Sequence, residues 1–173
     1  MKLPARFPGR GGAVATPFAP EEAVKIAVSG SKAGKLVFSL GSTMESVGEV
    51  EAAAEKLAAE AGLDEDACFH VTMAVREAAL NAVLHGNEYD PAKQITASFE
   101  NNGKSLIVTI ADEGPGLDPE KIPDPRAPEN LLRGTGRGIF LIRSLMDEVH
   151  FRQLHPGTEL TLIKHLAPAP PNP

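Results

Sequence analysis

The sequence feature that most restricts the fold is a pair of short segments, residues 94–100 and 105–111, that flank Asn101-Asn-Gly103. Apolar and polar residues alternate along both segments, which is the pattern of β-strands with one buried face. The Asn-Gly pair between them is a preferred sequence for a hairpin turn. The chain therefore contains an antiparallel hairpin whose apolar face needs a second layer to cover it.

Two predicted helices supply that layer. Residues 43–61 carry apolar side chains every three to four positions, and Gly62 follows as a stop. Asp64 is a suitable N-cap for a second helix over about 65–85, which Gly86 ends.

Further short segments complete the predicted order of strand, two helices, hairpin, connection, helix and hairpin. Additional strands are expected at 35–40, 148–153 and 158–164, and a third helix at 139–145. This order predicts an α/β two-layer sandwich with strands in one layer, helices in the other, and a mainly antiparallel mixed sheet.

Composition excludes several functional classes. The chain has 173 residues, of which 42% are apolar, and this suits a single domain with one core. The net charge of −6 and the lack of a basic patch argue against a nucleic-acid partner. A single cysteine, Cys68, excludes an intramolecular disulfide. No run reaches the roughly 20 apolar residues of a membrane span, so we expect a cytoplasmic protein without a membrane partner.

Proline and glycine mark the predicted boundaries. Frequent prolines and glycines predict a flexible extension over 1–34, followed by one domain over 35–166 and a disordered proline-rich tail over 167–173. Residues 117–133 contain four prolines and cannot form one long helix. We interpret this long connection as a lid over a ligand, with an ordered surface loop as the alternative.

The candidate chemistry starts on the second predicted helix. Glu77 and Asn81 are four residues apart and therefore lie on one helix face, where a carboxylate and a carboxamide can hold a hydrated divalent cation. A merely solvated polar stripe is the alternative interpretation. Two downstream segments favour a site: Asp112-Glu-Gly-Pro-Gly116 after a strand, and Gly134-Thr-Gly-Arg-Gly138 before a helix.

These three segments resemble the ATP-binding boxes of the GHKL superfamily. NAVLHGN, DEGPG and GRGIFLIRSLMDEV look most like the anti-sigma factor serine/threonine kinases of bacterial partner-switching systems. The resemblance spans about residues 36–166, and three boxes in order are far more specific than one. It implies a Bergerat-type ATP-binding fold with ATP and Mg²⁺ as cofactors.

The resemblance assigns one group of residues to the adenine end. A carboxylate can accept a hydrogen bond from the exocyclic amine of adenine, and Asp112 is the matching acid. Gly114 and Gly116 would let the base approach the backbone. Thr158, which follows Gly157, matches a late box whose hydroxyl supports the acid and the base.

A second group belongs to the phosphate end. Backbone N–H groups of Gly134, Gly136 and Gly138 and the start of the following helix suit an anion, and Arg137 is a candidate for direct phosphate contact. Asn81 is the candidate Mg²⁺ ligand, because this ion usually takes only one or two protein ligands beside phosphates. Glu77, one turn earlier, is then free to act as the catalytic base.

The site residues alone leave the acceptor open between a protein hydroxyl and water. The resemblance favours a kinase that phosphorylates an anti-sigma factor antagonist protein, with a sigma factor as a second partner. A nucleotide-gated module that sequesters a regulator without catalysis is one alternative, and a detached histidine-kinase-like ATPase domain is another. The oligomeric state also stays open, a homodimer included.

Overall fold

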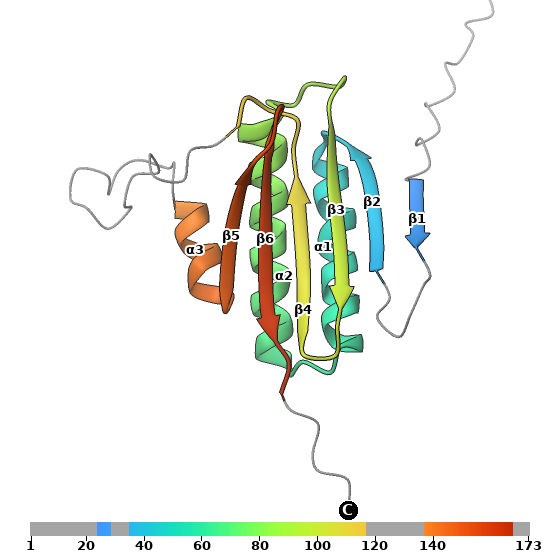
Figure 1. Cartoon of the computed structure of the whole chain (residues 1–173), viewed down its shortest axis with the longest axis vertical. Coiled ribbons are helices and arrows are strands. Elements are labelled where there is room, and N and C mark those ends of the chain that lie inside the picture. Colours follow the sequence, from blue (N-terminus) through green and yellow to red (C-terminus); the bar gives the residue numbers. More distant parts are fainter. Residues whose placement is uncertain (1–23, 29–34, 117–136, 168–173) are drawn as a thin grey trace, which may run out of the picture.

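The computed structural model describes residues 24–28, 35–116 and 137–167 (Figure 1). Its six strands form one sheet in the order β1-β2-β3-β4-β6-β5. The strands are β1 (Val24–Val28), β2 (Lys35–Gly41), β3 (Gln94–Asn101), β4 (Ser105–Ala111), β5 (Glu148–Gln153) and β6 (Thr158–His165). All five pairings between these strands are antiparallel.

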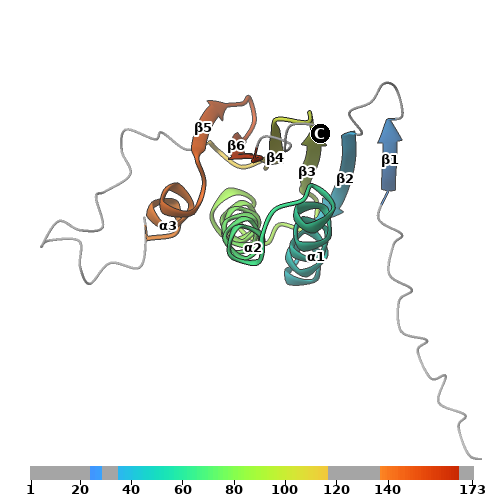
Figure 2. The same ribbon diagram turned by 90° about the horizontal axis from the view of Figure 1, so that it is seen from below.

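Three α-helices lie on one face of the sheet, as Figure 2 shows. They are α1 (Met44–Glu60), α2 (Glu65–Asn81) and α3 (Arg137–Leu145), and α3 packs against α2 and β5. The expected α/β two-layer sandwich is therefore confirmed. Among the described residues, no helix combines the length and apolar character needed to cross a membrane.

The helix starts follow the predicted capping chemistry. The Thr43 hydroxyl accepts a hydrogen bond from the Ser46 N–H at 3.2 Å, and an Asp64 carboxylate oxygen accepts one from the Ala67 N–H at 2.8 Å. Each cap satisfies a donor that the helix itself leaves unpaired. The two helices thus begin at defined residues, which sets the position of everything they carry.

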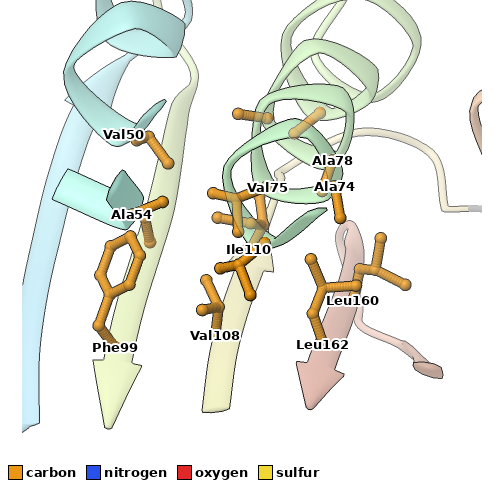
Figure 3. Close-up of a cluster of buried hydrophobic side chains, with 14 of the residues drawn as sticks. Val50, Ala54, Ala74, Val75, Ala78, Phe99, Val108, Ile110, Leu160 and Leu162 are labelled. Atoms are coloured by element: carbon orange, nitrogen blue, oxygen red, sulfur yellow. The ribbon is translucent and has the colours of Figure 1, made fainter. Parts of the chain in front are cut away.

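The core lies between the sheet and the first two helices (Figure 3). Small side chains of the helices, such as Ala54, Ala74 and Ala78, face larger ones of the sheet, such as Phe99 and Leu162, and all five are buried. The alanines let the helix backbones approach the strands closely, so the larger strand residues fill the space between layers. α2 is consequently held firmly against β4 and β6.

Two local features differ from the sequence expectation. Val24–Val28, within the segment expected to be a flexible extension, form β1 and pair with β2. The last proline before it is Pro20, and three of its five residues are β-branched, which explains why this part suits a strand. Residues 1–23, 29–34, 117–136 and 168–173, which include the expected lid and nearly all of the tail, lie outside the described residues.

The second difference is at the end of the long predicted helix. α2 ends at Asn81 and continues as a π-helical turn, η1 (Ala82–Gly86), in which the Asn87 N–H donates to the Ala82 carbonyl at 2.8 Å. Glu88 and Tyr89 then adopt positive φ angles of 54° and 57°. Single π turns and left-handed non-glycine residues both cost conformational energy and concentrate at functional sites.

Candidate functional site

The sequence-predicted residues fall into two groups in the structure. Asp112, Gly114, Gly116 and Thr158 lie where β4 ends and β6 begins. The other group lies where α3 begins against α2, and it consists of Glu77, Asn81, Arg137 and Gly138. Gly134 and Gly136 lie outside the described residues.

Asp112 is oriented by backbone groups on both sides. Its Oδ1 accepts hydrogen bonds from the Gly114 N–H at 2.8 Å and the Thr158 N–H at 3.2 Å. Its own N–H donates to the Thr158 carbonyl at 3.0 Å. Its Oδ2 receives no hydrogen bond from any described residue, so this oxygen is the one available to a ligand. Both contacts of Thr158 with Asp112 run through the Thr158 backbone, and the role expected of the Thr158 hydroxyl stays a prediction.

The electrostatic setting of Asp112 is also unusual for a carboxylate. Burial raises its pKa above the ordinary value, against the lowering effects of the N–H groups of Gly114 and Thr158 and of the Lys93 charge. A carboxylate held partly out of water with one oxygen unpaired is a candidate binding group.

Three glycines make room around Asp112. A Cβ on Gly86 would lie within 2.7 Å of Asp112 Oδ2, and one on Gly114 would overlap the Gly86 carbonyl. A Cβ on Gly157 would overlap the Asp112 carbonyl. The end of η1, the start of the 112–116 segment and the β5–β6 turn therefore meet backbone to backbone. From the sequence, Gly86 is expected only to end a helix, and neither its contact with Asp112 nor that of Gly157 could be foreseen.

A closed ring of hydrogen bonds lies beside Asp112. Asn87, fully buried, donates from Nδ2 to the Gln94 carbonyl at 2.9 Å. The Gln94 N–H donates to Glu113 Oε2 at 2.8 Å, and the Glu113 N–H donates to Asn87 Oδ1 at 2.8 Å. This ring joins the end of η1, the start of β3 and the residue after Asp112. The partners of Asn87 lie in β3 and just after Asp112, so no local sequence pattern marks them.

At the other end of the site, Glu77 and Asn81 lie under the first turn of α3. A Cβ on Gly138 would overlap Glu77 Oε1 and would come within 3.1 Å of Asn81 Nδ2. Only glycine lets α3 begin this close to α2. The helical spacing of Glu77 and Asn81 therefore brings both side chains to a single point beside the start of α3.

Neither side chain is paired within the described part of the chain. Asn81 Nδ2 is buried without a hydrogen-bond partner, and no described residue forms a hydrogen bond or ion pair with the Glu77 carboxylate. A half-turn of the amide exchanges its nitrogen and oxygen, so this position can offer an acceptor to a cation. The unsatisfied amide beside a carboxylate fits a Mg²⁺–nucleotide group, because one protein oxygen is enough for such an ion.

Comparison with known proteins agrees with this geometry. Residues 40–164 match the family described as histidine kinase-like ATPase domain. The anti-sigma F factor of Anoxybacillus flavithermus is 34% identical over 136 residues, covering 76% of this chain and 90% of that protein. The serine-protein kinase RsbW of Bacillus subtilis is 32% identical over 128 residues, covering 70% and 79%.

A solved structure gives the same fold. The RsbU and RsbW domains of Rv1364c from Mycobacterium tuberculosis superpose with a TM-score of 0.52 at 21% identity, covering 78% of this chain and 33% of that one. The family match spans most of the described domain, and the two relatives match over most of their own length. The chain therefore belongs to the histidine kinase-like ATPase domain family, in the group of the anti-sigma F factors and RsbW serine-protein kinases.

Proposed function

We propose that this protein transfers the γ-phosphoryl group of ATP to a serine or threonine of an anti-sigma factor antagonist, and that a sigma factor is its second partner. The observation that carries the proposal is the position of Glu77 and Asn81 under the start of α3, without partners among the described residues. The names of the relatives, anti-sigma F factor and serine-protein kinase RsbW, support the choice of protein substrate.

Asp112 is the proposed base-reading residue. Its Oδ2 can accept a hydrogen bond from the exocyclic amine of adenine, whereas guanine presents a carbonyl oxygen at the corresponding position. If guanine were bound, Asp112 Oδ2 would face the carbonyl oxygen of the base and neither oxygen would have a hydrogen-bond donor, which costs free energy in a half-buried site. Gly114 and Gly116 support this residue indirectly: the space where their side chains would lie is taken by the Gly86 carbonyl and the Gln153 amide, which pack beside Asp112.

Asn81 is the proposed ligand of Mg²⁺, and Arg137 and the N–H groups at the start of α3 are proposed to contact phosphate. When held by Asn81, Mg²⁺ would supply positive charge that offsets the negative charge of the phosphate groups. A helix N-terminus adds partial positive charge at the same place. The phosphate end is thus matched to an anion although the chain as a whole carries a net charge of −6.

Glu77 is the proposed general base. It accepts the proton of the acceptor hydroxyl while that oxygen bonds to the γ-phosphorus. The bond from the γ-phosphorus to the bridging oxygen breaks, and ADP leaves with the electron pair. Glu77 fits this role because its carboxylate makes no other hydrogen bond among the described residues and borders a surface hollow.

The test compares Glu77→Gln with the wild type. Glutamine keeps the size of the side chain but cannot take the proton, so transfer should fall by about 10²–10⁴-fold while ATP still binds. The protein substrate is captured from a lysate of the source cells with ATP present, and its phosphosite is mapped by mass spectrometry with labelled ATP. ATP affinity is measured by calorimetry.

Glu55→Gln is the matched control, because Glu55 is an exposed glutamate on α1 and should leave transfer unchanged. Nucleotide-dependent capture of a protein without any transfer, and with no effect of Glu77→Gln, would instead indicate a binding module that does not turn over. Phosphate found on a histidine of this chain would indicate the histidine-kinase alternative.

A further inference from the structure

A surface hollow of about 400 Å³ opens where α3 begins against α2. It is lined by Glu77, Arg137, Gly138, Phe140 and Leu141. The proposed base thus shares its surroundings with two large apolar side chains. These two side chains form an apolar wall of the hollow that does not suit a phosphate group, because neither Phe140 nor Leu141 offers a hydrogen-bond donor to an oxyanion.

Phe140 is placed outward by the helical period of α3. Ile142, on the core side, is fully buried, and Met146 just after the helix is 6% exposed, whereas Phe140 is 43% exposed. A single exposed aromatic side chain is common on protein surfaces and would mean little alone. Its position in the same hollow as the Glu77 carboxylate is what connects it to the reaction.

We propose that this hollow seats the phosphoacceptor segment of the protein substrate, with an apolar side chain next to the acceptor residue packed on Phe140 and Leu141. The inference rests on the proposed kinase function and adds a substrate preference to it. The acceptor must therefore carry an apolar residue within two positions of its reactive serine or threonine.

The reach of a peptide chain supports this preference. The acceptor hydroxyl must come within about 2.6–3.2 Å of the Glu77 carboxylate to give up its proton. Neighbouring Cα atoms are only ~3.8 Å apart, so residues flanking the acceptor must lie over the adjoining wall of the hollow. That wall is Phe140 and Leu141, and a polar flanking residue packed on it would lose hydration without gaining a hydrogen bond from either side chain.

The test separates docking of the acceptor from binding of the nucleotide. For Phe140→Ala, the KM for the captured antagonist protein should rise about 5- to 20-fold, the effect of losing much of the packing on one aromatic side chain. The kcat should change less than the KM, and Phe140→Leu should restore part of the affinity. The Kd for ATP is measured in parallel by calorimetry.

Phe69→Ala is the matched control. Phe69 is 61% exposed on α2, two turns before Glu77, and does not line the hollow, so its removal should leave the KM for the acceptor unchanged. A second arm uses synthetic peptides that span the mapped phosphosite, with the flanking apolar residue either kept or replaced by the uncharged polar residue Gln. The wild type should prefer the apolar peptide, and Phe140→Ala should lose most of that preference.

Each outcome decides a different point. If the wild type transfers no phosphate to any protein, the proposed function fails and this inference fails with it. If transfer occurs but Phe140→Ala and Phe69→Ala give equal KM values, the kinase stands and the docking surface is wrong. A large loss of ATP affinity in Phe140→Ala, or a mapped site without a neighbouring apolar residue, would also overturn it.

Discussion

At the scale of single residues, each end of the site has one polar atom without a hydrogen-bond partner among the described residues, an acceptor at one end and a donor at the other. Asp112 is a half-buried carboxylate with Oδ2 unpaired, and Asn81 is an amide whose buried Nδ2 lacks a partner among the described residues. Both arrangements cost free energy in the protein alone. A nucleotide with its metal ion would satisfy both at once, so each residue gives a separate test.

Replacing Asp112 by Asn should weaken ATP binding by about 1.5–3 kcal/mol, the scale of a hydrogen bond to a charged group. The Asn oxygen can still accept from the Gly114 and Thr158 N–H groups, but an NH₂ group would then face the adenine amine, donor against donor. Calorimetric titration of wild type and variant with ATP and GTP measures the effect. Equal loss for both nucleotides would argue against a base-reading role.

The same titrations should depend on pH in one direction. Burial raises the pKa of Asp112, so its proton binds at a less acidic pH than that of an ordinary aspartate. As pH falls through this raised pKa, Oδ2 loses its acceptor character and ATP affinity of the wild type should fall. Asp112→Asn should lack this component, which separates it from the titration of ATP itself.

Replacing Asn81 by Ala should abolish the part of ATP affinity that depends on Mg²⁺. The affinity of the wild type in Mg²⁺ should exceed that in EDTA by about tenfold or more, the scale of one charge-assisted contact, and the variant should show little difference. Its thermal stability should not drop through a lost hydrogen bond, because Asn81 Nδ2 has no described partner. Full magnesium dependence in the variant would exclude Asn81 as the ligand.

At the scale of secondary-structure elements, the site depends on how three segments are joined behind Asp112. Asn87, Gln94 and Glu113 form a ring of hydrogen bonds between the end of η1, the start of β3 and the residue after Asp112. The π turn of η1 shifts the backbone so that Asn87 enters the interior instead of continuing the helix surface. The strained turn is therefore stabilised by the buried amide that it positions.

Replacing Asn87 by Ala should lower the free energy of unfolding by about 2–5 kcal/mol, because the Gln94 carbonyl and the Glu113 N–H both lose their partner. The preference for ATP over GTP should fall as well, since Glu113 directly follows Asp112. Denaturant unfolding and nucleotide titration of the folded variant measure the two effects.

Asn102→Ala is the control for this ring. The Asn102 side chain also makes two hydrogen bonds to the backbone, accepting from the Lys104 and Ser105 N–H groups, but in the turn at the opposite end of β4. It should cost less stability and leave nucleotide preference unchanged. Asn87→Asp keeps the acceptor for Glu113 and should recover part of the preference; a variant that loses only stability would reduce Asn87 to a structural residue.

At the scale of the whole molecule, periodicity and turn chemistry predicted most elements. The hairpin around Asn101-Asn-Gly103 and the caps at Thr43 and Asp64 are local signals, and the structure has strands and helices where they predict them. β1 was missed because the prolines and glycines around it outweighed its own short β-branched pattern, and its pairing with β2 is visible only in the structure. The π turn was missed because apolar periodicity does not distinguish between hydrogen-bond registers.

The residues of the candidate site likewise include some that a local sequence pattern marks and some that it does not. Glu77 and Asn81 could be named from helical spacing, and Asp112 from its place after a strand. The roles of Gly86 and Gly157 could not, because they arise from contacts between backbones that are far apart in the chain. Short sequence segments thus indicate which polar side chains belong to the site, whereas the space around those side chains depends on tertiary packing.

The position of β6 has a consequence for synthesis of the protein. β6 is the last strand along the described residues, yet it lies inside the sheet between β4 and β5. While a ribosome is still adding these residues, the edge of β4 has no partner, and an uncovered strand edge can pair with another chain. Asp112 also lacks its hydrogen bond from the Thr158 N–H until that residue, 46 positions later, has been added. Adenine recognition of the proposed kind therefore becomes complete only after β6 has been made, and the nucleotide can stabilise chains that contain β6 but not shorter precursors without it.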